Sequence, residues 1–268
     1  MSVNLEEIKI RQQAMWSSGN YAKIAWVTVP LSDILCEAIE VRPGSDVLDV
    51  ASGTGHVALA AARRFANVTS SDYLPKLLEV GRARAAAELL EITFIEADAE
   101  NLPFKDGSFD FVLSAIGAMF APNQEKVASE LTCVCRSGGR IGMINWTLTE
   151  VRAELFKTVA SYVPPTEGLK APDLWGNEVR VHELLDDKVS DLSFTYGSLP
   201  QHFISPEHYV DFMLTNFGPM LKAFESLSQD RRELFRADIA AFLARHNRAT
   251  DGSLTFDNDY VIVLATNH

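Results

Sequence analysis

The sequence predicts an α/β protein built on a seven-stranded, mostly parallel sheet with helices on both of its faces. Short apolar segments typical of buried strands alternate with helical segments between residues 46 and 146. Such an alternation predicts parallel pairing through right-handed crossovers. A further apolar segment, residues 260–265, closes the chain after a long helical stretch. The 268 residues, 47% of them hydrophobic and 22% charged, suit one large folded domain rather than a disordered chain.

The individual elements are expected from local signals along the chain. Strands are expected at 46–51, 67–71, 92–96, 109–114, 140–146, 192–196 and 260–265. Helices are expected at 5–16, 21–41, 55–65, 75–90, 123–136, 150–162 and 177–188, with two or three more between 205 and 247. Pro30 is expected to interrupt the second helix, which then restarts from an N-cap at Ser32 or Asp33. Ser137-Gly138-Gly139 is expected to end the helix at 123–136, because glycine commonly terminates helices.

Charge and cysteine content exclude several classes of function. The 24 basic and 36 acidic residues give a net charge of −12, which disfavours a broad cationic surface for nucleic acid or anionic lipid. The three cysteines make no disulfide framework, and Cys133 and Cys135 face different directions on the expected helix, so no metal site is expected. No apolar run reaches the length of a membrane span, and the N-terminal segment lacks the apolar core of a signal peptide. We therefore expect a cytoplasmic protein that binds neither nucleic acid nor membrane.

The most informative segment joins the first strand to the following helix and reads Asp49-Val50-Ala51-Ser52-Gly53-Thr54-Gly55. Its glycines let the backbone adopt positive φ angles and approach a ligand closely. Asp49 lies four residues before Gly53, where a carboxylate would repel a pyrophosphate but suit an ammonium or sulfonium group. Asp72 ends the next strand, 19 residues after Gly53, a position that suits hydrogen bonds to a ribose diol. The alternative is a structural turn, with Asp72 and Asp98 serving only as helix or turn caps.

These residues resemble motif I of the class I S-adenosylmethionine-dependent methyltransferases. Residues 96–104 and 106–110 are similar to the signatures after strand 3 and at strand 4 in the ubiquinone/menaquinone-biosynthesis-like branch (methyltransferase type 11). The segment Arg136-Ser137-Gly138-Gly139-Arg140 is similar to the signature before strand 5, although Ser137 stands where the family more often has proline. The resemblance covers residues 40–146 closely. It implies a Rossmann-like sheet whose last strand is antiparallel, together with a helical lid insertion.

The resemblance also implies that S-adenosylmethionine is the cofactor and S-adenosylhomocysteine its product. The loop Ala51–Gly55 would hold the methionine part, with Asp49 near its ammonium group. Asp72 would bind the ribose hydroxyls, and Tyr73 would pack on the adenine. Because these residues follow successive parallel strands, we expect them to meet at one edge of the sheet.

The remaining contacts that the resemblance implies come from later strands and from the N-terminus. Asp98 and the N–H of Ala99 would contact the adenine, and Ser114 and Ala115 would line the sulfonium side. Tyr21 would fold over the cofactor, simple packing being the alternative. The implied cofactor-binding residues are Tyr21, Asp49, Ala51, Ser52, Gly53, Gly55, Asp72, Tyr73, Asp98, Ala99, Ser114 and Ala115.

The segment after the fourth strand favours a small, partly hydrophobic metabolite as the methyl acceptor. Residues 116–120 are apolar and lack the Asn/Asp-Pro-Pro-Tyr motif of enzymes that methylate nucleic-acid amino groups. Methyl transfer is an in-line displacement that depends mainly on holding donor and acceptor in alignment. A base helps only when the acceptor arrives protonated, and His182, His202 and His208 are candidates for it, although a surface or core-capping histidine is the simpler explanation of each. No catalytic residue is therefore assigned.

Two other functions remain open at this point. A protein of this fold can bind S-adenosylmethionine without methylating, in a regulatory or pericyclase-like role. A dinucleotide-dependent dehydrogenase is disfavoured by Asp49 and Ser52. If the chain is a methyltransferase, we expect one methyltransferase domain over 1–268, present as a monomer or homodimer. Its expected parts are an N-terminal helical lid (1–40), a cofactor-binding core (41–150), two variable acceptor-side segments (151–200 and 201–250) and a final strand (254–268).

Overall fold

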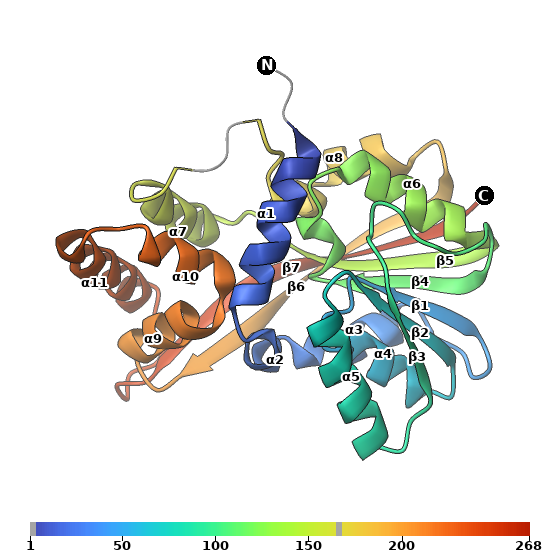
Figure 1. The fold of residues 1–268 in the computed structure, drawn as a ribbon, viewed down its shortest axis with the longest axis horizontal. Helices are drawn as coiled ribbons and strands as arrows, with labels where there is room; N and C mark the ends of the chain where they lie inside the picture. Colours follow the sequence, from blue (N-terminus) through green and yellow to red (C-terminus); the bar gives the residue numbers. More distant parts are fainter. Residues whose placement is uncertain (1–3, 165–167) are drawn as a thin grey trace. The chain divides into compact units, whose positions relative to one another are not determined.

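The computed structural model describes residues 4–164 and 168–268 and contains a seven-stranded sheet of order β3-β2-β1-β4-β5-β7-β6 (Figure 1). The strands are β1 (Asp46–Val50), β2 (Asn67–Asp72), β3 (Ile92–Glu96), β4 (Phe109–Ala115), β5 (Cys135–Trp146), β6 (Val189–Phe203) and β7 (Leu254–Asn267). β1 to β5 pair in parallel, and β7 runs antiparallel to β5. The predicted seven-stranded α/β sheet with an antiparallel last strand is therefore confirmed.

The chain divides into two compact units, of which the first contains the parallel strands. This sheet unit comprises Thr28–Thr147, Lys170–Gly197 and Tyr260–His268. Its helices are α3 (Val29–Ala38), α4 (His56–Ala62), α5 (Pro75–Ala87), α6 (Gln124–Val134) and α8 (Glu178–Leu185), with short 3-10 turns η2 (Ala118–Phe120) and η3 (Pro172–Gly176). α3, α4 and α5 lie on one face of the sheet, and α6 and α8 on the other (Figure 1).

The core of the sheet unit lies where the central strands meet α4. Leu48, Val50 and Leu113 are completely buried. Ala58, Ala60 and Ala61 of α4 are buried as well, so small side chains let this helix approach the strands closely. This packing fixes the end of β1 and the start of α4, between which the glycine loop lies.

Two predictions of local structure are wrong. α3 begins after Thr28, and Pro30 lies in its first turn, where the missing N–H costs nothing; Ser32 is therefore a buried residue inside the helix and not its cap. Ser137-Gly138-Gly139 belongs to β5 and does not end α6. Phe109 pairs with Cys135, whereas Phe111 pairs with Arg140, so these residues of β5 form a bulge, and Gly138 has a positive φ of 71°.

The second unit, the helical unit, comprises the described parts of Met1–Val27, Leu148–Leu169 and Ser198–Asp259. Its elements are α1 (Leu5–Ser18), α2 (Tyr21–Ile24), η1 (Ala25–Val27), α7 (Glu150–Ala160), α9 (Pro206–Asn216), α10 (Gly218–Glu225) and α11 (Gln229–Arg245). Phe235, Ile239 and Phe242 of α11 are the centre of its own apolar core. The helical insertion predicted before the last strand is present between β6 and β7, although β6 extends to Phe203, beyond the strand expected at 192–196. Within residues 4–164 and 168–268, no helix combines the length and apolar character needed to cross a bilayer.

Candidate functional site

The loop between β1 and α4 has three residues in left-handed conformations. Ala51, Gly53 and Gly55 have φ angles of 53°, 57° and 76°. Two backbone hydrogen bonds of 2.9 Å stabilise the loop, from the N–H of Ser52 to the carbonyl of Ser71 and from the N–H of Gly55 to the carbonyl of Ser52. A Cβ added to Gly53 would meet no atom of the described residues within 4 Å. The loop therefore presents bare backbone to open space at Gly53, as a close approach to a ligand requires.

Asp49 lies beneath this loop and is almost completely buried, with 1% exposure. Its Oδ2 accepts a 2.9 Å hydrogen bond from the N–H of Ala58 in the first turn of α4. Burial raises the pKa of Asp49 to about 8, the negative charge of Asp72 adds to this, and the hydrogen bond from Ala58 opposes it. A cation bound nearby would favour the ionised carboxylate.

Asp72 joins the end of β2 to the glycine loop. Its Oδ2 accepts from the N–H of Gly53 and its Oδ1 from the N–H of Leu74, both at 2.9 Å. Burial raises the pKa of Asp72 to about 6, and these backbone hydrogen bonds oppose the shift. Each oxygen of an ionised carboxylate can accept a second hydrogen bond, so Asp72 retains capacity for a ligand hydroxyl.

The predicted adenine side lies at the end of β3, next to Asp72. In the parallel register of β2 and β3, Asp72 lies opposite Glu96. The N–H of Ala97 donates to the backbone carbonyl of Asp72 at 3.0 Å. Asp98 and Ala99 follow directly and are half-buried. Oδ1 of Asp98 accepts a 2.9 Å hydrogen bond from the N–H of Glu100, so Asp98 also caps a turn.

Tyr73 follows Asp72 and is half-buried. Burial, together with the neighbouring acids Asp72, Asp98 and Glu100, raises the pKa of its hydroxyl. The hydroxyl is therefore neutral at physiological pH, and the packing of the ring on the adenine stays a prediction.

The end of β4 is tied to the end of β1 by Ser114. Its buried hydroxyl donates to the carbonyl of Val50 at 2.8 Å and accepts from the N–H of Ala118 at 3.0 Å. Ala115 is half-buried and ends the strand. Ser114 thus holds the two strand ends together through its side chain, and its implied contact with the cofactor stays a prediction.

Gly117 lies beside the glycine loop and was not singled out by the sequence analysis. A Cβ on Gly117 would lie 2.2 Å from the carbonyl oxygen of Ala51, closer than any two such atoms can approach. The loops after β1 and β4 can therefore meet only because residue 117 is glycine. A glycine two residues after a buried strand was the available signal, but sequence alone does not say which loop it meets.

We expect Gly117→Ala to lower the free energy of unfolding by about 1–3 kcal/mol, because the added methyl group forces the two loops apart. Calorimetric titration should also show weaker binding of S-adenosylhomocysteine. Gly142→Ala is the matched control, since its Cβ would meet the flexible ends of Ile39 and Leu35 within the same sheet unit. It should lower stability in urea titrations but leave binding unchanged. Unchanged stability and binding in Gly117→Ala would contradict the proposed contact.

The three candidate bases each have a structural partner. Nδ1 of His182, on α8, lies 2.7 Å from a carboxylate oxygen of Asp186, the residue that caps the C-terminus of this helix. Nδ1 of His202 lies 3.3 Å from the hydroxyl of Thr255, and Nδ1 of His208 accepts from the N–H of Ile204 at 3.4 Å. His182 belongs to the sheet unit and the other two to the helical unit. These contacts support the simpler explanation of all three histidines, and none is assigned a catalytic role.

Tyr21 lies in the helical unit within an aromatic cluster. Its ring makes edge contacts with Trp16 and Phe217 at centroid distances of 5.2 and 6.2 Å. Its hydroxyl accepts a 3.0 Å hydrogen bond from the N–H of Gly218. The role of Tyr21 over the cofactor stays a prediction.

Two buried donors near the end of β5 have no acceptor within the described residues. They are Nδ2 of Asn145, on β5, and Nε1 of Trp175, on η3. η3 packs directly on the end of β5, since a Cβ on Gly176 would lie 2.2 Å from the carbonyl oxygen of Trp146. An ordered water or a polar ligand atom would satisfy such donors. No group of three or more His, Cys, Asp or Glu side chains within residues 4–164 and 168–268 is arranged to hold a metal ion.

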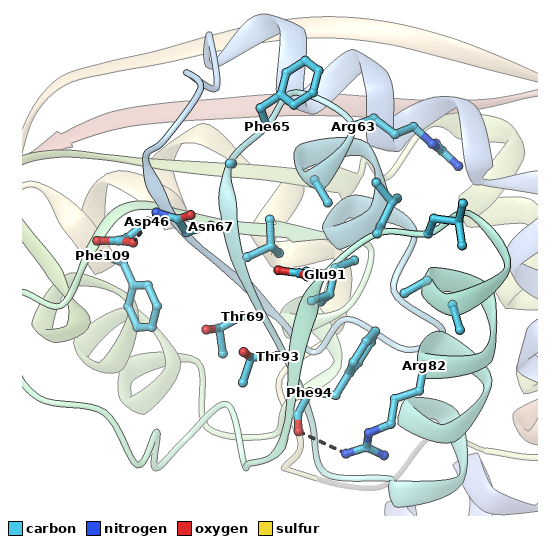
Figure 2. A pocket seen from close by; sticks show the side chains of 18 of the residues that line it. Asp46, Arg63, Phe65, Asn67, Thr69, Arg82, Glu91, Thr93, Phe94 and Phe109 are labelled. Carbon is cyan, nitrogen blue, oxygen red and sulfur yellow. Dashed lines mark hydrogen bonds between the residues drawn. The ribbon is translucent and has the colours of Figure 1, made fainter.

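A broad hollow lies at the opposite ends of the strands (Figure 2). Asp46 and Asn67, which begin β1 and β2, and Glu91, which precedes β3, line it together with Arg63 and Arg82. It contains none of the residues that the sequence analysis implicated. The strand-end acids and the glycine loop therefore remain the candidate site.

Comparison with protein families gives a match to a methyltransferase domain over residues 48–143. An uncharacterized protein of Mycobacterium tuberculosis is 44% identical over 218 residues, which cover 80% of this chain and 79% of that relative. The ubiquinone/menaquinone biosynthesis C-methyltransferase of Brucella suis is 42% identical over 115 residues, covering 41% of this chain and 43% of that relative.

Two solved structures are similar in fold. The YcgJ protein of Bacillus subtilis has a TM-score of 0.62 at 18% identity, covering 88% of this chain and 97% of that one. The [4+2]-cyclase SpnF has a TM-score of 0.55 at 20% identity, covering 89% of this chain and 80% of that one. At these identities the likeness concerns the fold alone.

Proposed function

Because the chain belongs to the class I S-adenosylmethionine-dependent methyltransferases and has S-adenosylmethionine as its cofactor, we propose that it methylates a small, partly hydrophobic metabolite. The observation that carries the proposal is the juxtaposition of two buried acids with an open glycine loop. Asp72 binds the N–H of Gly53 directly, and Asp49 lies under the same loop. These groups follow adjacent parallel strands, where ligands of open α/β sheets bind.

The residues present fit the cofactor. Open space in front of Gly53 admits the methionine part of the molecule. Burial favours the protonated form of Asp49 while no cation is near. A cation beside this carboxyl would stabilise its ionised form, and the two opposite charges would then attract each other. Asp72 has the free acceptor capacity that a ribose diol requires, and Tyr73 has a ring for the adenine.

When bound, the cofactor supplies a methyl group on a sulfonium centre, which an acceptor displaces in line. The contribution of this chain is to hold both molecules in position and to exclude water. Gly117 and Ser114 keep the ends of β1 and β4 together beside the glycine loop. No side chain is assigned as a base, so the acceptor would arrive with a lone pair or carbanion available, or lose its proton to solvent.

The apolar segment after β4 supports a partly hydrophobic acceptor. Ala118 and Met119 of η2 are buried, and η2 contacts η3, which carries Trp175. The Brucella relative is named for C-methylation in quinone biosynthesis, so quinols belong among the acceptors to test. The net charge of −12 supports a small molecule over a nucleic acid.

The test is product analysis with methyl-labelled S-adenosylmethionine and a panel of phenols, quinols, amines and carboxylic acids. We expect S-adenosylhomocysteine to bind in calorimetry and the label to appear in one acceptor class. Binding without labelled product across the panel would favour a non-methylating role, such as that of the cyclase with the similar fold. Binding of NAD in place of S-adenosylhomocysteine would overturn the proposal.

A further inference from the structure

Arg84 of α5 reaches the centre of the glycine loop. Its Nη1 donates to the carbonyl oxygen of Thr54 at 3.1 Å and to the hydroxyl of Thr54 at 3.3 Å. Thr54 is 2% exposed and lies between the two left-handed glycines, Gly53 and Gly55. The geometry points to Arg84 as a positioning residue of the cofactor site, which fixes the loop from behind without touching the ligand itself.

Arg84 can fix the conformation of the glycine loop because the peptide bond is planar. The carbonyl of Thr54 and the N–H of Gly55 belong to one rigid plane. Arg84 donates to the carbonyl oxygen of this plane, and the N–H of the same plane, which belongs to Gly55, donates to the carbonyl of Ser52 at 2.9 Å. Gly55, which bounds the plane on one side, can adopt many φ values, so a plane held at one end only could rotate. Arg84 supplies the second point that holds the loop in its observed conformation.

His56, the first residue of α4, extends the same contact. Nη1 and Nη2 of Arg84 lie 3.0 Å from Nε2 and Nδ1 of His56. Burial and the positive charges of Arg84 and Arg63 lower the pKa of His56 to about 4, so its ring is neutral and one nitrogen can accept from Arg84. Glu88 interacts electrostatically with Arg84 and forms an ion pair with Arg63. Arg84 therefore joins α5 both to the loop and to the start of α4.

Arg82 is a matched control on the same helix. Its Nη2 donates to the carbonyl oxygen of Phe94 at 3.0 Å, and its guanidinium lies over the ring of that residue (Figure 2). It thus links α5 to β3 as Arg84 links α5 to the loop. Loss of Arg82 removes a comparable helix contact but leaves Thr54 and His56 untouched.

The experiment compares Arg84→Met, Arg84→Lys and Arg82→Met with the unmodified protein, using titration with S-adenosylhomocysteine and thermal unfolding. We expect Arg84→Met to raise Kd at least tenfold. Arg84→Lys should recover most of this loss, because an ammonium group can also donate to the carbonyl of Thr54. Arg82→Met should change Kd less than twofold with a similar loss of thermal stability.

Equal Kd values for Arg84→Met and the unmodified protein would overturn the inference. So would a loss of affinity in Arg82→Met as large as in Arg84→Met, or a failure of lysine to recover any affinity. If Arg84→Met does not fold, Arg84→Gln takes its place, because its shorter neutral side chain loses the guanidinium contacts with Thr54 and His56. A Kd for Arg84→Gln within twofold of the unmodified protein would then overturn the inference. The readout needs only cofactor binding, so its result is independent of the acceptor and of whether methyl transfer is found.

Discussion

Asp72→Ala is expected to weaken binding of S-adenosylhomocysteine by about 1–3 kcal/mol, or roughly 5- to 150-fold in Kd. The carboxylate of Asp72 accepts hydrogen bonds from the N–H groups of Gly53 and Leu74. Alanine leaves both donors unsatisfied and releases the glycine loop from β2. It also removes the acceptors proposed for the ribose hydroxyls. Calorimetric titration at constant pH measures the loss directly.

Two further variants separate these contributions. Asp72→Asn keeps the size of the side chain but replaces one acceptor with a donor, so we expect an intermediate loss. Asp187→Ala removes an exposed aspartate of the same sheet unit and should leave Kd unchanged. An unaltered Kd in Asp72→Ala would show that the acid has only the capping role that the sequence analysis kept as its alternative.

The sheet could be predicted because strand-forming and helix-forming segments alternate with distinct periods. The boundary between α6 and β5 could not, since Ser137-Gly138-Gly139 fits a helix end as well as a strand bulge. Pairing of Cys135 with Phe109, three residues out of step with the rest of β5, decides between the two. That pairing is a tertiary contact and leaves no local signal. Pro30 is a similar case, because proline fits both a break and a first helical turn.

The acids of the site could be predicted from their positions after successive strands. Asp49 and Asp72 require only that parallel strands end at the same edge of the sheet. Gly117 and Arg84 were not predicted, because their importance depends on contacts between segments distant in sequence. Gly117 meets Ala51, 66 residues away, and Arg84 meets Thr54, 30 residues away. Nothing in either local sequence indicates its partner.

The stability of the unliganded protein is expected to fall as pH rises from about 4 to about 8. Burial raises the pKa of Asp49 from its ordinary 3.8 to about 8, so in this range the folded protein holds a proton that the unfolded chain releases. The free energy of unfolding then decreases with pH, by at most about 1.4 kcal/mol for each pH unit. Asp72, with a pKa of about 6, acts in the same direction over the lower part of the range. His56, whose pKa is lowered to about 4, opposes one of the two acids between pH 4 and 6.5, so the fall is expected to be clearest above pH 6.5.

Binding of the positively charged cofactor should make the ionised form of Asp49 more stable than its protonated form. A cation near the carboxylate favours ionisation, so binding at pH 7 is expected to release a proton and to strengthen as pH rises toward 8. Titration of S-adenosylmethionine in buffers of different ionisation enthalpy measures that proton. Asp49→Asn is the matched variant, since its amide oxygen can still accept from the N–H of Ala58 but cannot ionise.

In Asp49→Asn we expect weaker binding, no proton release from this site, and a stability that changes less with pH than that of the unmodified protein. The three results belong together, because one buried carboxyl accounts for all of them. Proton release of the same size in Asp49→Asn would show that a group other than Asp49 releases the proton. Between pH 6.5 and 8, a stability that falls no more steeply with pH in the unmodified protein than in Asp49→Asn would contradict a buried, protonated Asp49, since such a group loses stabilising free energy over that interval.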